Sequence, residues 1–374
     1  MSFHRRLSHS SRRGAAFCAT LLAVAAPAFA AQTEDLRIVS YNIEADVNGN
    51  KTPNPGLSSV LEAIGQQNVN GITQPIDILA LQETTSNSLT VAPIVSDLNA
   101  FYGTGTYAMS TYQGLSSGNN VGTGNGPNAL IYNTSALNLI ASVGVSTPLG
   151  TSVNGINRQP IRYEFEPIGG SLSDVFYLYV DHYKSGATAT DLTARNDEAV
   201  IIRADEATLP ANARVLYMGD FNTGSSSEAS YQTITAPGQG HAVDPINLPG
   251  NWASNTTFKG ILTESATDLR FRDDFILATS NIITDPSGLQ YVTNSYHVFG
   301  NNGSTAVNST VDLNSNTALN GVPNAGAILT DLTTASDHLP VVADFMSPVP
   351  EPASAPLLLG LAVFLWRCRS TRRH

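Results

Sequence analysis

Short apolar runs alternate along the chain with longer segments of helical spacing. The runs cover residues 36–41, 76–81, 129–132, 175–180, 215–218, 275–278 and 341–345. Runs this short, partly β-branched or aromatic and ending at glycine, aspartate or asparagine, predict buried strands. Apolar positions three or four residues apart predict helices over residues 57–66, 91–98 and 192–207. Strands interleaved with helices favour mixed sheets that are covered by helices.

Two stretches lack a clear pattern of either kind. Residues 103–127 are rich in small polar residues and predict a loop or hairpin. Residues 285–335 have a similar composition and predict a surface hairpin, with a lid over a site as the alternative. His241 and His297 belong to no motif, and we expect both at the surface.

The two ends of the chain have the composition of processing segments. Residues 1–30 combine a basic start, a short apolar core and small residues up to Ala30, which predicts a secretory signal peptide. The Sec route is favoured over the twin-arginine route. Residues 348–374 place an arginine cluster after an apolar run at 355–366, which predicts a short transmembrane helix with its arginines inside. Residues 31–347 then form one domain outside the cytoplasm.

The tail also resembles a known sorting signal. Pro350-Glu351-Pro352, the apolar run and the arginines follow one another as in the PEP-CTERM signal of Gram-negative bacteria. This resemblance implies cleavage at the triplet by an exosortase-type enzyme, so that the protein is secreted or held on the outer surface. A plain C-terminal anchor is the alternative.

Charge and cysteine content change the picture once these ends are set aside. Eight of the 19 lysines and arginines lie in the ends but only one of the 30 acidic residues, so the domain is more negative than the net charge of −11. Such a domain should bind a phosphate backbone poorly unless a divalent cation bridges them. This disfavours a tight nucleic-acid binder, although a nuclease that touches few phosphates remains compatible. Both cysteines, Cys18 and Cys368, lie in the ends, which excludes disulfides and cysteine metal sites from the domain.

Polar residues stand at one end of the apolar runs in six motifs. The motifs are RIVSYNI with Asn42, DILALQE with Glu83, FYLYVDHYKSG with His182, GDFN at 219–222, DDFIL at 273–277 and SDHLPV at 336–341. Rigid strands with polar ends are a common way to present chemistry. Carboxylate and amide oxygens suit Mg²⁺, Mn²⁺ or Ca²⁺, and histidines suit proton transfer. The set therefore predicts a metal-assisted hydrolase.

The order of the six motifs resembles the endonuclease/exonuclease/phosphatase superfamily, over about residues 35–345. That group includes deoxyribonucleases, abasic-site endonucleases, neutral sphingomyelinases and inositol-phosphate phosphatases. The resemblance implies an α+β fold, a four-layer α/β/β/α sandwich with two mixed sheets packed face to face and the site at one end. His182 stands where abasic-site enzymes tend to carry tyrosine, which favours the deoxyribonuclease and sphingomyelinase branch.

The resemblance also implies a metal site and an acid–base pair. Glu83 would be the principal Mg²⁺ ligand beside Asn42, with Asp337 as a further ligand of the metal or its water; Mn²⁺ or Ca²⁺ are the alternatives. His338 can take a proton from water or meet the phosphate as imidazolium, and a second acid is needed to orient it. By resemblance that acid is Asp274, with its neighbour Asp273 as the rival.

The remaining candidates would handle the phosphate and the leaving group. Asp220 and Asn222 point the same way in an extended segment, so Asp220 could position the water and Asn222 could bond a phosphoryl oxygen; a turn is the alternative. His182 could protonate the leaving oxygen. Substrate-binding candidates are Arg158 and Arg195, whose alternative is surface charge, and Asn128, which resembles a family site position.

Three functions are compatible with this sequence. We expect a secreted metal-dependent phosphodiester hydrolase, an extracellular nuclease that acts as a monomer and binds its nucleic-acid substrate weakly. A phospholipid or small phosphate-ester hydrolase is the alternative. A non-catalytic surface module on the same fold is disfavoured, because every motif retains its polar residues.

Overall fold

A computed structural model describes residues 32–47, 51–116, 126–146, 156–171, 173–264, 266–311 and 313–349. The predicted signal peptide, the sorting triplet and the apolar run at 355–366 all lie outside these ranges. The prediction of a transmembrane helix is wrong for the described part of the chain, where no helix is long and apolar enough to cross a membrane. The longest one, α3 (Ala189–Glu206), carries charged residues along its length.

Seven strands form the first sheet. Its central strands β1 and β4 run parallel, while β1 pairs antiparallel with β15 on its other side. In order across the sheet the strands are β13 (Gln290–Tyr291), β15 (Val341–Val349), β1 (Gln32–Asn42), β4 (Ile76–Gln82), β6 (Ala129–Asn133) and β5 (Tyr107–Met109), with β14 (His297–Val298) beside β15.

Six strands form the second sheet, which is also mixed. Its central strands β9 and β10 run parallel, and β10 pairs antiparallel with β12. The order is β11 (Ala242–Val243), β12 (Asp274–Thr279), β10 (Arg214–Asp220), β9 (Phe176–His182), β8 (Ile161–Pro167) and β7 (Leu137–Gly144). A separate small hairpin joins β2 (Asn68–Val69) to β3 (Ile72–Thr73).

The two sheets pack face to face, with β1 against β10 and β12, and β4 against β9 and β10. Every residue of β4, β10 and β12 is buried, because these strands are covered on both faces. Strands of this kind read as continuous apolar runs, which is why they could be predicted. The peripheral strand β8 alternates between buried and half-buried residues and was not predicted.

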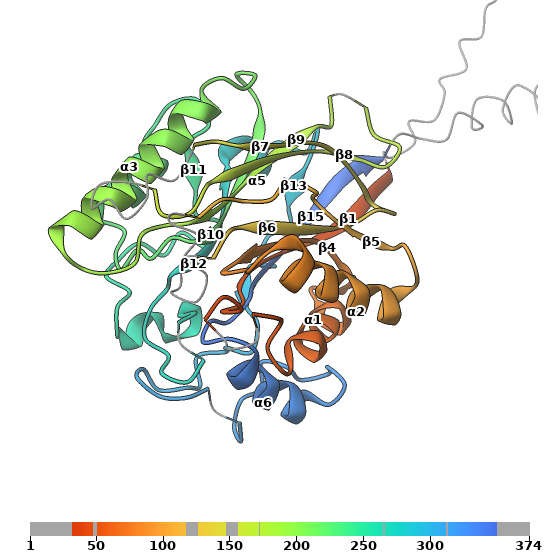
Figure 1. Cartoon of the computed structure of the whole chain (residues 1–374), viewed down its shortest axis with the longest axis vertical. Coiled ribbons are helices and arrows are strands. Elements are labelled where there is room, and N and C mark those ends of the chain that lie inside the picture. Colours follow the sequence, from red (N-terminus) through yellow and green to blue (C-terminus); the bar gives the residue numbers. More distant parts are fainter. Residues whose placement is uncertain are drawn as a thin grey trace, which may run out of the picture. The chain divides into compact units, whose positions relative to one another are not determined.

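Helices cover the outer face of each sheet. On the first sheet α1 (Leu57–Gln66) contacts β4, α2 (Ala92–Tyr102) and α6 (Ala325–Ala335), while α3 lies on the opposite side (Figure 1). Tyr179 of β9 donates a hydrogen bond of 2.7 Å to Asp205 of α3. The other helical segments are η1 (Asn87–Val91), α4 (Ala229–Ile234), η3 (Thr256–Ile261) and α5 (Ser280–Thr284). This arrangement confirms the predicted four-layer α/β/β/α sandwich.

The stretch at 285–335 differs from the prediction of a surface hairpin. It contributes β13 and β14 to the first sheet and α6 to its helical layer. Phe299 and Leu319 within it are buried. His297 is half-buried, and its Nε2 lies 2.8 Å from Gln67 Oε1. The buried apolar residues of this stretch are separated by many small polar residues. Because they form no continuous run, the sequence pattern did not reveal them.

Candidate active site

The polar ends of the central strands meet at one end of the sandwich. Asn42 is the last residue of β1, and Glu83 follows the last residue of β4. His182 and Asp220 end β9 and β10 and are paired in register, and Asp274 begins β12 opposite Asp220. Because parallel strands end on the same side and an antiparallel partner begins there, residues from distant motifs are brought together.

Asp220 is the centre of this cluster. Its Oδ2 accepts a 3.1 Å hydrogen bond from Asn42 Nδ2 and lies 3.2 Å from His182 Nε2 and 3.8 Å from His338 Nε2. Burial by itself raises the pKa of this carboxyl, but the neighbouring imidazoles of His182 and His338 outweigh burial and hold the pKa below its usual range. Asp220 is therefore an ionised hydrogen-bond acceptor at neutral pH.

His338 and Asp274 form a buried pair. His338 Nδ1 lies 2.7 Å from Asp274 Oδ2. Burial lowers the pKa of the imidazole, but the carboxylates of Asp274, Asp337 and Asp220 raise it well above its usual value. The pair therefore holds a proton on His338, which presents an imidazolium to the centre of the site.

The loop before β15 fixes the position of His338. The Ser336 hydroxyl donates to the backbone oxygen of Asn42 over 2.7 Å and accepts the His338 N–H over 3.0 Å. Asp273, the rival orienting acid, instead has its carboxyl against that of Glu264. Burial, Asp220 and Glu264 raise the pKa of Asp273 well above its usual value.

Glu83 lies on the other side of the cluster, in a strained backbone conformation with φ of 55°. Asn42 Nδ2 donates to its Oε1 over 3.1 Å, and His182 Nε2 lies 3.8 Å away. Burial and the adjacent charge of Asp46 raise the pKa of Glu83 to about 8. A half-buried carboxylate that faces a second acid is poorly stabilised without a cation.

Asp337 and Glu44 form a separate acidic pair nearer the surface. The backbone N–H of Asp337 donates to Glu44 Oε2 over 3.1 Å, and Asp337 Oδ1 lies 3.8 Å from His338 Nε2. Within the described part of the chain, three groups have ligand atoms close enough to hold one ion: Glu83–His182–Asp220, Asp220–Asp274–His338 and Glu264–Asp337–His338. Glu83 and Asp337, both predicted metal ligands, fall in different groups.

At the end of β10, Asp220 and Asn222 flank Phe221 in the sequence, and the aromatic ring of Phe221 is buried. Phe221 is buried and stacks with Tyr183 and Phe275, at centroid distances of 4.8 Å and 5.4 Å. Asn222 takes a left-handed conformation with φ of 47°, and its backbone N–H donates to Asp220 Oδ1 over 3.0 Å. Its Nδ2 donates to the Tyr183 carbonyl over 3.2 Å.

The three predicted substrate-binding residues are all buried, with Arg158 at 3 % and Arg195 at 2 % exposure. Arg158 Nη1 donates to the Tyr183 carbonyl over 2.9 Å, and its charge acts on Glu83. Arg195 directs its donors to Glu228 and to the carbonyls of residues 184 and 186, so it braces the loop after β9. Asn128 donates to the Gln159 carbonyl over 2.9 Å.

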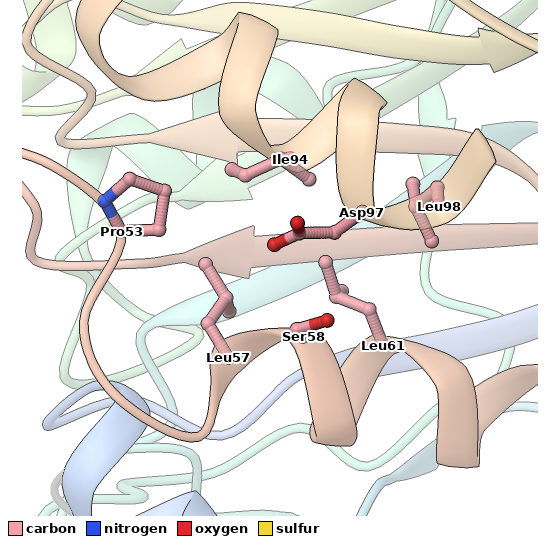
Figure 2. Close-up of a pocket in the computed structure, with 7 residues that line it drawn as sticks. All are labelled: Pro53, Leu57, Ser58, Leu61, Ile94, Asp97 and Leu98. Atoms are coloured by element: carbon pink, nitrogen blue, oxygen red, sulfur yellow. The ribbon is translucent and has the colours of Figure 1, made fainter. Parts of the chain in front are cut away.

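A cavity of about 370 Å³ lies beside the cluster. Asn222 and Asp273 line it on the side of the site, and Glu264, Glu228 and Phe271 form other parts of its wall. The lining has three carboxyl groups and the one guanidinium of Arg195, a balance that is unfavourable for a polyanion. A smaller hollow between α1 and α2 is lined by apolar side chains, Ser58 and Asp97 (Figure 2). It holds no group of side chains suited to catalysis.

The donor set fits a divalent cation at Glu83. Carboxylate oxygens are the ligands that Mg²⁺ and Mn²⁺ prefer. Asp46, a residue that the sequence interpretation missed, brings a second buried carboxyl against that of Glu83. Its Oδ2 accepts the Gly126 N–H over 2.8 Å, while no donor from the described residues reaches Oδ1. Its place four residues after Asn42, in an acidic loop at a strand end, was the available signal.

The fold and the site together define a class: a two-sheet sandwich with a histidine and carboxylate cluster at one end. The chain belongs to the endonuclease/exonuclease/phosphatase family, whose model matches residues 39–338. Members of this family are hydrolases of phosphoester bonds and commonly use divalent metals. A search of curated proteins finds no match.

Solved structures show the same fold at low sequence identity. An endonuclease/exonuclease/phosphatase from Beutenbergia cavernae is 15% identical with a TM-score of 0.50, over 85% of this chain and 73% of that chain. TDP2 from D. rerio, complexed with a single-strand DNA product, is 14% identical with a TM-score of 0.47, over 83% and 98%. A mannosyl-6-phosphatase from Bacteroides thetaiotaomicron is 16% identical with a TM-score of 0.45, over 83% and 99%.

Proposed function

We propose that this protein is a metal-dependent phosphodiesterase and that nucleic acid is its substrate. The observation that carries this proposal is the cluster around Asp220, where two histidines approach one ionised carboxylate within 3.8 Å and Glu83 lies alongside. Hydrolysis of a phosphodiester needs a positioned water, neutralisation of charge on the phosphate and a proton for the leaving oxygen. The cluster contains groups suited to each task.

We assign the attacking water to Asp220. Its carboxylate is ionised and is held in place by Asn42 and His182. Because its pKa lies below the usual range, Asp220 is suited to orienting the water by accepting a hydrogen bond. His182, whose pKa burial and Arg158 lower to about 4, is neutral at pH 7 and donates its Nε2–H toward Asp220.

We assign the phosphate to His338 and Asn222. The His338 imidazolium, kept charged by Asp274, presents Nε2 to the site and can neutralise or protonate an oxygen of the substrate. The side-chain amide of Asn222 lies where the site borders the cavity. Glu83, with Asp46 beside it, would hold Mg²⁺ or Mn²⁺, which when bound supplies a Lewis acid for the phosphoryl oxygen.

A second substrate class is favoured by one observation. The cavity beside the cluster has acidic walls, and the guanidinium of Arg195 is occupied by Glu228 and backbone carbonyls. Few free cations would then contact neighbouring phosphates of a polymer. A phospholipid head group or a small phosphate ester, with one phosphate at the reactive centre, is the alternative substrate.

Parallel digestion separates these substrates. The purified protein is incubated with plasmid DNA, RNA, sphingomyelin vesicles and a small phosphate monoester, each with Mg²⁺ and with EDTA. Nicking or shortening of nucleic acid in Mg²⁺ supports the proposal, and gel analysis over time distinguishes internal from terminal cleavage. Hydrolysis of the lipid or monoester alone would replace nucleic acid by the alternative, and no hydrolysis of any substrate would contradict the proposal.

We also propose export and sorting, on the sequence features of the two ends. The nuclease would then be released or displayed outside a Gram-negative cell after cleavage near Ala30 and at Pro350-Glu351-Pro352. Mass spectrometry of the protein recovered from a host with an exosortase would define both ends. A secreted form that retains residues 350–374 would contradict sorting by an exosortase. Size-exclusion chromatography with light scattering would test the expected monomer.

A further inference from the structure

We infer that Asp46 completes the cation site with Glu83, and that the acid two residues earlier, Glu44, takes no part in it. The inference rests on the proposed function, because it assumes that a divalent cation is required. It names the chain's own residues that hold the ion. Asp46 belongs to none of the six motifs from which the site was predicted.

Two backbone hydrogen bonds hold Asp46 against Glu83. The N–H groups of Ala45 and Asp46 both donate to the Glu83 carbonyl, over 3.0 Å and 3.1 Å. The Asp46 and Glu83 carboxyls lie within hydrogen-bonding reach of each other. The loop after β1 is therefore built onto the residue after β4, so the approach of the two acids does not depend on flexible side chains.

Gly126 closes the other side of Asp46. Its N–H donates to Asp46 Oδ2 over 2.8 Å. A Cβ at this position would lie 2.3 Å from the Thr84 carbonyl and 2.9 Å from the Asp46 side chain, so no larger residue fits without a shift. Asp46 is completely buried, and its rotation is limited by this contact.

One oxygen of Asp46 has no donor apart from the facing Glu83 carboxyl. Among the described residues nothing else donates to Oδ1, and Glu83 can donate only while it keeps its proton. A buried polar atom with no partner calls for an ion, a water or a proton to satisfy it. With two carboxylates converging, a divalent cation satisfies both charges at once.

Glu44 has a different environment. Its backbone takes a left-handed conformation with φ of 49°, and its Oε2 accepts the Asp337 N–H over 3.1 Å. Glu44 therefore secures the loop that carries Asp337 and His338. Glu44 and Asp46 lie in one short loop but have different roles. Substitutions at these two residues are therefore a matched pair for comparison.

The test is calorimetric titration of the full protein with Mn²⁺, without substrate, for wild type, Asp46→Asn and Glu44→Gln. Asparagine keeps an oxygen for the Gly126 N–H and removes the charge. We expect affinity to fall at least about tenfold in Asp46→Asn. Glu44→Gln should stay within about threefold of wild type, since its carboxylate only accepts a backbone hydrogen bond. Asp46→Asn with wild-type affinity would overturn the inference, and so would an equal loss in Glu44→Gln.

Thermal unfolding in EDTA supplies a readout that a purely structural role would not produce. Asparagine keeps the acceptor for the Gly126 N–H and removes a buried charge that the cation would offset, so the metal-free Asp46→Asn protein should unfold at the same or a higher temperature than wild type. A lower midpoint would mean that Asp46 is a structural residue and would overturn the inference. Should Asp46→Asn not fold, Asp46→Ser retains an acceptor for Gly126 and is tested in its place.

The result is separable from the proposed function. If wild type binds Mn²⁺ but hydrolyses no phosphodiester, the proposed function fails while the assignment of Asp46 stands. If wild type hydrolyses phosphodiesters but Asp46→Asn binds Mn²⁺ normally, the assignment fails alone. Wild type that binds no Mn²⁺ overturns the inference, whatever its activity.

Discussion

Two groups of buried carboxylates lie side by side in this site, and they are neutralised in different ways. Asp220 and Asp274, from the second sheet, have the imidazoles of His182 and His338 at 3.2 Å and 2.7 Å. Asp46 and Glu83, from the first sheet, face each other, and the charge of Arg158 acts on both. Imidazoles lower the pKa of Asp220, while burial raises the pKa of Asp274 to about 6 and, together with Asp46, raises the pKa of Glu83 to about 8. The first of these groups contains the positive charge of His338, and for the second we propose a cation from solution.

The two sheets contribute different chemistry to the site. The second sheet, with the loop before β15, supplies a preformed network in which imidazoles face carboxylates, while Asp274 Oδ1 and His182 Nδ1 have no partner among the described residues. The first sheet supplies an acidic position where we propose that a metal binds. Loss of the metal and loss of the histidine network should therefore leave distinguishable defects.

The largest expected effect is on the histidine network. His338→Ala and Asp274→Ala should each lower kcat by about 10²–10⁴-fold, the range for general acid–base groups. Because Asp274 acts by charging and orienting His338, the double variant should be little slower than His338→Ala alone. Steady-state kinetics of the three variants measure this. Fully multiplicative losses would mean that the two residues act separately, and Asp273 would then be tested as the partner.

The next effect separates the two groups by proton binding. The neighbouring carboxylates raise the pKa of His338, so in EDTA its imidazole should remain protonated above pH 7. Asp274→Asn should lower that pKa markedly, while Glu83→Gln, in the other group, should change it little. Titration of the His338 ring by NMR measures both shifts. A large shift in Glu83→Gln would contradict the division into two groups.

A third pair of buried acids has neither an imidazole partner nor a proposed cation. It shows how much stability an unneutralised buried carboxyl costs. Glu198 of α3 and Asp181 of β9 are buried near each other, and burial raises the pKa of Glu198 to about 8. A carboxyl whose folded pKa exceeds its unfolded value contributes stability below about pH 4.5 that is lost as pH rises through about 8. The melting temperature of wild type in EDTA should therefore fall over this window relative to Glu198→Gln, by about 2–6 °C. Parallel pH-dependent curves for the two proteins would contradict the shifted pKa.

The smallest effect lies outside both groups and serves as a control. Thr188 caps α3, accepting the Asp191 N–H on its hydroxyl and donating to the Asp191 carboxylate. Thr188→Ala should cost about 0.5–2 kcal/mol of the free energy of unfolding. Activity below the unfolding transition should be unchanged, as measured by denaturant melts beside kinetic assays. A parallel loss of activity would show that the loop after β9 depends on this cap.

The sequence predicted the central strands and the residues at their ends because both follow from burial. A strand covered on two faces reads as an apolar run, and a polar residue at its end is visible against it; β4 with Glu83 is an example. The strands β7 and β8 were missed because their partly exposed residues alternate. The fold, and the meeting of the six motifs at one site, could therefore be predicted from the sequence.

The roles of three acids could not be predicted, although Asp273 lies in a motif and Asp46 in an acidic loop. Asp46, Glu264 and Asp273 acquire their roles from contacts between distant segments, such as Asp46 with Gly126 and Glu264 with Asp273. The engagement of Arg195 with Glu228 depends on the approach of α3 to α4, which no local pattern reveals. Apolar anchors in residues 285–335 were hidden for the same reason.

The central claim is that hydrolysis needs a cation at the first-sheet acids in addition to the histidine network. The most direct measurement follows hydrolysis of bis(4-nitrophenyl) phosphate by the purified protein before chelation, after exhaustive chelation and after Mg²⁺ or Mn²⁺ is returned. Hydrolysis should fall to background on chelation and recover when the cation is restored. Undiminished hydrolysis in the chelated protein would contradict this claim.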